Sequence, residues 1–269
     1  MKKRAVGSYI ILIAVCAFLL LPLIAIMINS FATSWTHILP NGYTTDYYRQ
    51  VMEIHDFWPS VGRGLIISII PVLITGVVVI LAMYTSVLYF PWVDKMMQTI
   101  CMLPHTLKGI ILAIAVLSLY VGVPGPLSDR ILMLTLVYCV SILPFVYQGI
   151  KNNLNAINVT NLVEAATILG ASKFRAFFSV VVPNMISGIL VSALLSMSTL
   201  FGDFAIIKIL AGSRFMTAQQ LLYNARNVEM QLVAVIVLIL FAIILVISAT
   251  AFILEARGKR DVAVKVTED

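Results

Sequence analysis

Residues 164–184 read EAATILGASKFRAFFSVVVPN, a run of small, charged and helix-forming residues that ends near a proline. The sequence before and after this run is almost continuously apolar. Charged side chains are costly inside a bilayer, so a segment of this composition between two long apolar runs is expected to lie outside the lipid. The segment therefore predicts a helical connection between two membrane spans.

The composition indicates a membrane protein. The chain has 269 residues, of which 61% are hydrophobic and 11% are charged, and its mean hydropathy is +1.03. A soluble domain carries roughly 25% charged residues, so this chain needs lipid as part of its solvent. The net charge of +6 does not indicate nucleic-acid binding, because the basic residues are scattered among the loops between apolar runs.

The apolar runs predict an all-α membrane protein with six transmembrane helices. Each run reaches the ~20 residues that cross ~30 Å of hydrocarbon. The first run follows Lys-Lys-Arg, as a secretory signal would, but it is longer than the roughly 7–15 residues of a signal core, so an uncleaved span is expected. The six predicted spans are residues 8–30, 64–89, 97–121, 131–150, 185–210 and 231–254.

The distribution of Lys and Arg predicts that both termini are cytoplasmic. With that orientation eleven basic residues lie inside and five outside, as the positive-inside rule requires. The segment 151–184 then faces the cytoplasm. The expected organisation is a first helix and outer segment over 1–60, a transmembrane domain over 61–255 and a cytoplasmic tail over 256–269.

Cap signals divide the segment 151–184 into two short helices. Asn161 is a good N-cap, and Glu164 three residues later forms a variant of the capping box. Gly170 is expected to end this helix in the left-handed conformation. Ser172 can cap a second helix, KFRAFFSVVV, which Pro183 is expected to end or kink.

The first short helix carries a thin apolar face. Leu162, Ala165, Ala166 and Leu169 recur at helical spacing and share one side. Two alanines at its centre keep that side thin enough to enter a groove of another protein. The same residues could equally pack beneath the protein's own spans, and periodicity does not choose between the two.

The spacing in this segment resembles the EAA signature of permease subunits in ABC importers. That signature is Glu-Ala-Ala, three residues, Gly, nine residues, then aliphatic-x-aliphatic-Pro, and its aliphatic positions, usually Ile and Leu, are both Val here. The resemblance extends over roughly Gly62 to Leu254 and is greatest to the spermidine/putrescine, ferric iron, phosphonate and thiamine permeases, which LPF at 143–145 and FGDF at 201–204 also fit. The matching residues are Glu164, Ala165, Ala166, Gly170, Val180, Val182 and Pro183.

The resemblance implies a transport subunit of the bacterial inner membrane and not an enzyme. It implies two ABC ATPase subunits, a second permease subunit that is a different chain, and an extracytoplasmic substrate-binding protein. The segment 151–184 would hold a coupling helix that lies in a groove of the ATPase. The chain has no GxxxxGK[ST] loop, so ATP and Mg²⁺ are expected on the partners and no cofactor on this chain. The ATPase-coupling residues would be Leu162, Glu164, Ala165, Ala166, Leu169, Gly170 and Pro183.

Two charged residues inside predicted spans are candidates for the substrate pathway. Asp203 lies roughly 25 Å from the cytoplasmic end of its span, where it could attract a cationic solute or simply be a solvated helix-end carboxylate. Lys108 lies near mid-bilayer and could meet an anionic solute or pair with a buried acceptor. The three cysteines and three histidines lack the spacing of a metal site, so neither a metal nor a catalytic residue is expected.

Two other functions remain open at this point. A secondary transporter would couple transport to an ion gradient and need no ATPase, but the predicted spans hold few acidic residues for an ion site. A membrane scaffold or receptor would need no pathway at all. A cytoplasmic ATPase that binds the chain in fixed stoichiometry would distinguish the importer from both.

Overall fold

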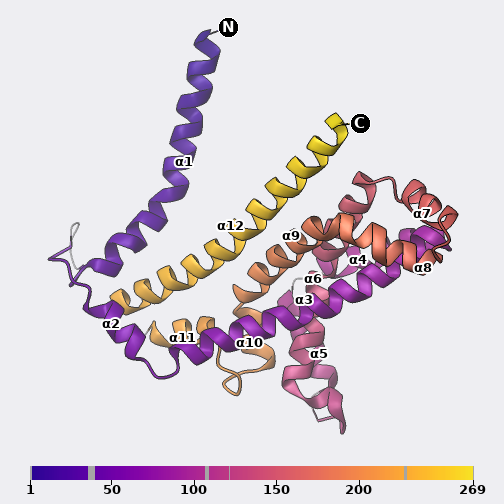
Figure 1. Cartoon of the computed structure of the whole chain (residues 1–269). Coiled ribbons are helices and arrows are strands. Elements are labelled where there is room, and N and C mark those ends of the chain that lie inside the picture. Colours follow the sequence, from indigo (N-terminus) through magenta and orange to yellow (C-terminus); the bar gives the residue numbers. More distant parts are fainter. Residues whose placement is uncertain (1, 36–39, 107–108, 121, 227–228, 269) are drawn as a thin grey trace. The chain divides into compact units, whose positions relative to one another are not determined.

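A computed structural model describes residues 2–35, 40–106, 109–120, 122–226 and 229–268. These residues are helical almost throughout, and the described backbone contains one isolated antiparallel bridge, between Ala32 and Tyr43. The predicted all-α class is therefore confirmed. Figure 1 labels the α-helices. In chain order the elements are α1 Lys2–Phe31, α2 Asp46–Glu53, α3 Phe57–Leu88, α4 Pro91–Thr106, α5 Gly109–Tyr120, η1 Pro126–Ser128, α6 Arg130–Ala156, α7 Val159–Ile168, α8 Lys173–Ala176, η2 Phe177–Val181, α9 Val182–Phe201, α10 Ala205–Leu210, α11 Ala218–Ala225 and α12 Met230–Glu268.

The chain divides into two compact units. One unit comprises residues 1–61 and 217–243, and the other comprises residues 62–216 and 244–269. In the first unit, the end of α1 is joined to α2, because Ser30 and Tyr48 share a hydrogen bond of 2.8 Å between their hydroxyl groups. The second unit contains every residue of the functional site described below.

Five helices among the described residues are long and apolar enough to cross a membrane. They are Ile11–Phe31, Phe57–Leu88, Arg130–Ala156, Lys173–Phe201 and Met230–Leu254. Large apolar side chains on their surfaces are exposed in the isolated chain, for example Leu73 of α3 and Phe252 of α12. Exposed apolar surface of this extent is expected to face lipid or other subunits.

The predicted fifth span differs from the structure. In the third run the described residues are helical in α4, Pro91–Thr106, and in α5, Gly109–Tyr120, and residues 107–108 and 121 lie outside the described residues. In the fifth run, α9 ends at Phe201 and the six-residue α10 follows after a turn. The prediction of one continuous helix over 185–210 is therefore wrong, because the chain turns at 202–204 and α10 packs against α5 and α6.

Helix α6 is the centre of the second unit. It packs against α9, α4, α5 and α10, and its side chains Leu134, Tyr138 and Ile142 are almost fully buried. Small residues bring α6 and α9 close together: a Cβ on Gly149 would collide with Ser192, and a Cβ on Gly188 would collide with Asn153. The two helices that carry the segment 157–181 between them are thus held at close range.

Candidate functional site

Helix α7 begins one turn earlier than its sequence predicts. Its N-cap is Asn158, whose side-chain oxygen accepts a hydrogen bond from the backbone N–H of Asn161 at 3.4 Å. The prediction that Asn161 caps the helix is therefore wrong. Both asparagines are suitable caps, but the earlier start places Val159 and Val163 on one helical side, and both are buried. Burial of that pair decides between two caps of similar intrinsic quality.

The end of α7 is a Schellman turn, as predicted at Gly170. Gly170 has a φ of +90°, and its N–H donates to the carbonyl of Thr167 at 2.9 Å, while the N–H of Ala171 donates to the carbonyl of Ala166 at 3.0 Å. These two bonds satisfy carbonyls that the helix end would leave unpaired. No neighbour fills the space beside Gly170, so its left-handed backbone conformation alone favours glycine.

The second short helix begins as predicted and continues into the next span. The hydroxyl of Ser172 accepts a hydrogen bond from the N–H of Arg175 at 3.3 Å. The chain stays helical from Lys173 to Phe201, so of the two outcomes predicted at Pro183, an end or a kink, the end is wrong. The residues before it form a π-helical turn in which the N–H of Val182 bonds the carbonyl of Phe177. Proline lacks an N–H, and the π-helical turn directly before Pro183 adjusts the backbone where that hydrogen bond is lost.

The four apolar residues predicted to share one face of α7 are divided between two faces. Leu162 and Ala166 are half-buried and pack against the hydrophobic core of the unit. Ala165 is exposed, and Leu169 is 88% exposed. The face with Leu162 and Ala166 therefore packs α7 against the rest of the unit. The face with Ala165 and Leu169 is open to a partner.

The open face contains one apolar residue that sequence reasoning missed. Ile168 is 84% exposed, and it lies beside Leu169 at the tip of α7. Glu164 is exposed on the same side. Spacing from Asn161 through Glu164 and Ala165 to Ile168 marks this side as one helical face, and only burial of the other side shows that it is the open one.

An aromatic cluster joins α3 to the segment that follows α7. The ring of Tyr84 on α3 contacts those of Phe174, Phe177 and Phe178, with ring centroids 5.6, 5.3 and 5.9 Å away. The pairs with Phe174 and Phe177 are edge-to-face, and pairs of this kind contribute about 0.5–1.5 kcal/mol each beyond the area they bury. The cluster therefore packs α8 and the π-helical turn against α3.

A charged cluster joins α4 to the end of α6 that precedes α7. Asp94, in the first turn of α4, accepts hydrogen bonds from Lys151 Nζ at 2.5 Å and from the Tyr147 hydroxyl at 2.8 Å. Partial burial raises the pKa of Asp94, but the hydrogen bonds from Lys151 and Tyr147 outweigh it and hold the pKa below its ordinary value of 3.8. The pair is about one-quarter exposed, with side-chain exposures of 22% and 32%. This cluster is a charged brace between two helices.

The two pathway candidates have different outcomes. Lys108 lies outside the described residues. The carboxylate of Asp203 accepts hydrogen bonds from the Tyr138 hydroxyl at 2.9 Å and from the N–H of Ile206 at 3.1 Å. Asp203 therefore fixes the turn between α9 and α10 onto α6, and one of its oxygens already has two donors.

Comparison of the sequence with known proteins identifies a matching family and several relatives. Residues 76–260 match the family model described as binding-protein-dependent transport system inner membrane component. The chain is 24% identical over 244 residues to the spermidine/putrescine transport system permease protein PotC of Escherichia coli K12, covering 87% of this chain and 89% of that protein. It is 23% identical over 206 residues to the putative 2-aminoethylphosphonate transport system permease protein PhnV of Salmonella typhimurium, covering 75% of this chain and 76% of that protein.

Two solved structures share the fold. A chain of a bacterial ABC transporter involved in the import of the acidic polysaccharide alginate superposes with a TM-score of 0.66 at 16% identity, covering 96% of each chain. A chain of the MetNI methionine ABC transporter in an inward-facing conformation superposes with a TM-score of 0.58 at 17% identity, covering 74% of this chain and 95% of that one. At these identities the likeness concerns the fold alone.

Proposed function

The chain belongs to the family of binding-protein-dependent transport system inner membrane components, and on that premise we propose that it is the permease subunit of an ATP-driven importer that couples to its ATPases through α7. Membership makes it a multi-pass membrane permease whose relatives are transport subunits. The proposal adds the point of coupling, the partner at that point and the solute.

The observation that carries the proposal is the exposed tip of α7. Ile168 and Leu169 are each more than four-fifths exposed, although the other face of the same helix is packed against the unit. A short helix that presents an apolar tip fits the recognition of a helix by a groove. The partner would be one of two cytoplasmic ABC ATPases, which supply ATP and Mg²⁺, and α7 would therefore face the cytoplasm.

The residues predicted for coupling take different roles in this proposal. Leu169, Ala165 and Glu164 lie on the open face, where alanine permits close approach and Glu164 can meet a donor on the ATPase. Leu162 and Ala166 instead hold α7 onto the unit. Beyond these, Gly170 forms the turn between the two short helices, and Pro183 with the π-helical turn joins the second short helix to α9.

Movement of α7 would reach the spans by two connections. The Tyr84 cluster connects α8 and the π-helical turn to α3, and the contact of Lys151 with Asp94 connects the end of α6 to α4. Closure of the ATPases would displace α7, and these connections would carry the displacement to helices that line the pathway formed with a second, different permease subunit. The solute would thereby gain access to alternate sides.

The proposed solute is a small polar molecule delivered by an extracytoplasmic binding protein. The names of the two relatives refer to spermidine or putrescine and to 2-aminoethylphosphonate, which share a protonated amine. Asp203 is the carboxylate proposed for that amine and Lys108 the cation proposed for an anionic group. Mass spectrometry of the ligand on the copurified binding protein tests the solute directly.

Replacement of the α7 tip tests the coupling. Leu169→Asp and Ile168→Asp should each abolish copurification of the ATPase and ATP-driven uptake in proteoliposomes, because a carboxylate in an apolar groove is left without hydration. The thermal midpoint of the chain should not change, since both side chains are solvent-exposed. Met52→Asp, at an exposed apolar position of α2, is the matched control.

Retention of the ATPase by both tip variants would overturn the proposal. Uptake that follows an ion gradient and ignores ATP would instead favour the alternative, a secondary transporter. Uptake that stops while the ATPase still binds would place the defect in the connections to α3 and α4.

A further inference from the structure

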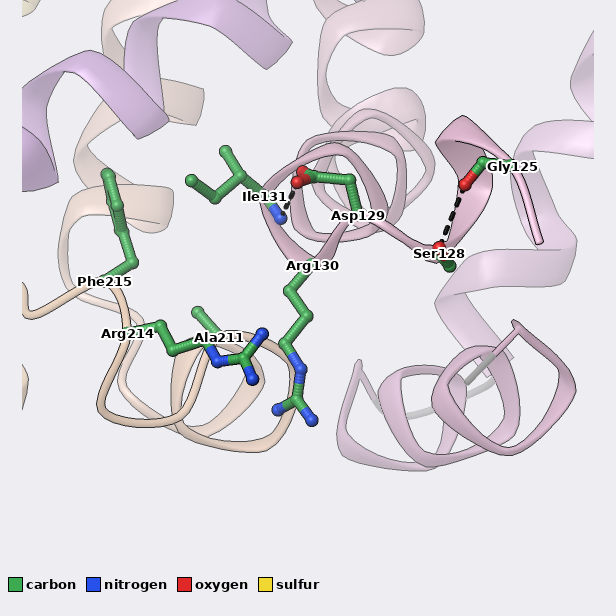
Figure 2. A pocket seen from close by; sticks show the side chains of 8 residues that line it. All are labelled: Gly125, Ser128, Asp129, Arg130, Ile131, Ala211, Arg214 and Phe215. Carbon is green, nitrogen blue, oxygen red and sulfur yellow. Dashed lines mark hydrogen bonds between the residues drawn. The ribbon is translucent and has the colours of Figure 1, made fainter. Parts of the chain in front are cut away.

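A cavity of about 330 Å³ lies at the opposite end of α6 from α7. With 27 residues in α6, the two ends are about 40 Å apart along the helix. Figure 2 shows Arg130, the first residue of α6, and Arg214, from the loop after α10, with their guanidinium groups extended into the same space. Ile131 and Phe215 form an apolar part of the wall.

The two positive charges are not balanced within the described part of the chain. The carboxylate of Asp129 lies closest in sequence, but its Oδ1 accepts hydrogen bonds from the N–H groups of Ile131 and Leu132, both at 2.9 Å. Figure 2 shows this carboxylate turned away from the guanidinium groups. Among residues that the structure describes, no carboxylate forms an ion pair with Arg130 or Arg214.

Both arginines border the same backbone turn. Arg130 Nη1 is 3.8 Å from the position that a Cβ on Gly212 would occupy, and Gly212 has a φ of +58°. The N–H of Arg214 donates to the carbonyl of Ala211 at 3.3 Å, which closes the turn that carries its side chain. Like charges that line one cavity repel each other, and an anion between them would reduce that repulsion.

We propose that this cavity is an oxyanion site that binds a phosphate group. One guanidinium fork already saturates the two oxygens of a carboxylate, whereas two forks match the three or more oxygens of a phosphate. The apolar wall at Ile131 and Phe215 would receive the carbon part of an organic phosphate. Arg130 begins a helix long enough to cross a membrane, so the phosphate belongs either to a phospholipid head group or to a soluble solute.

Phosphate titration of the full-length chain in a neutral detergent tests the site. Inorganic phosphate should raise the thermal midpoint relative to chloride at matched ionic strength. Arg130→Gln and Arg214→Gln should each weaken the apparent affinity about tenfold, the loss expected for a charge-assisted hydrogen bond. Arg214→Lys should weaken it less, because lysine keeps the charge and loses the fork. Arg49→Gln, at an exposed arginine paired with Glu53, should leave the affinity unchanged.

Native mass spectrometry of the chain from nanodiscs of phosphatidylglycerol and phosphatidylcholine separates the two sources. Retained lipid that is lost in both arginine variants identifies a head group, and a response to soluble phosphate without retained lipid identifies a solute. The proposal is overturned if phosphate and lipid have no effect on the wild-type chain, or if both variants respond as it does. It is also overturned if an acidic protein partner, and neither phosphate nor lipid, raises the thermal midpoint of the wild-type chain. No transport is measured, so the result stands apart from the test of α7.

Discussion

The two ends of α6 carry exposed groups of opposite chemical kinds. At the α7 end the Schellman turn pairs the backbone groups, and two apolar side chains, Ile168 and Leu169, are exposed on the same side as Glu164. At the other end the exposed groups are two guanidinium ions beside a capped helix start. Exposed apolar surface is buried when it enters a groove of another protein, and unbalanced positive charge is neutralised when an anion binds. The difference indicates a macromolecular partner at one end and a small anionic group at the other.

The close contact of α6 with α9 supports both ends, so breaking it should have the largest effect. Gly149→Leu should lower the free energy of unfolding by about 3 kcal/mol, because the new side chain would collide with Ser192. Thermal unfolding of the chain in detergent measures this loss, and ATPase binding and phosphate binding should fall together.

Gly76→Leu on α3 is the matched control, since no atom lies within 4 Å of the Cβ position there. Equal destabilisation by the two leucines would show that the collision is not what matters. Loss of only one function in Gly149→Leu would show that the two ends do not share α6 as a common support.

Replacing Gly170 should affect the α7 end alone. Gly170→Val should cost about 1–2 kcal/mol, because a side chain disfavours the left-handed conformation, and should uncouple ATP hydrolysis from uptake. Gly170→Asn should retain most of the coupling, since asparagine tolerates this conformation. The ratio of ATP hydrolysed to solute taken up measures the effect, and identical ratios in the two variants would contradict it.

Removing the central ring of the aromatic cluster should have a smaller effect. Tyr84→Leu should lower the free energy of unfolding by about 1 kcal/mol, since it removes two edge-to-face ring pairs, each contributing about 0.5 kcal/mol or more, while keeping most of the apolar volume. Uptake should fall more than ATPase binding. Tyr120→Leu, at the exposed end of α5, is the control. An equal fall in uptake for both variants would contradict the proposal that the aromatic cluster carries movement of α8 to α3.

The smallest expected effect is the pH dependence of the Asp94 brace. Its pKa is lowered by Lys151 and Tyr147, so the ion pair stabilises the fold fully above pH 3.8 and this contribution disappears as the pH falls through the lower pKa of the folded state. The gap in thermal midpoint between wild type and Asp94→Asn should therefore be widest at neutral pH and close in acid. Glu53→Gln, in an exposed pair, should show no such trend, and a constant gap for Asp94→Asn would contradict the ion pair.

Local signals predicted the segments whose structure depends on backbone chemistry. Gly170 was identified from its place after a periodic helix, and Ser172 from its place before the next, because caps act within a few residues. Asn158 was missed in favour of Asn161, since both residues can cap and only burial of Val159 and Val163 chooses between them. Ile168 was missed because helical spacing does not say which face of α7 packs against the unit and which stays exposed.

Pairings between distant residues could not be predicted from the sequence. Tyr84 precedes Phe174 by ninety positions, and Asp94 precedes Lys151 by fifty-seven; neither spacing carries a periodic signal. Asp203 was identified as a charge in a span, but its contact with Tyr138 was not. The turn at 202–204 also escaped detection, because α10 is as apolar as a continuing span would be.

The sequence by itself determined the all-helical class, most of the apolar spans and the turn at Gly170, because hydropathy and backbone preference act locally. Only the tertiary structure decided which face of α7 is open and which residues brace it, and it also decided that two arginines eighty-four positions apart share one cavity. Those outcomes depend on how helices pack, and packing is set by contacts between residues that no local pattern relates.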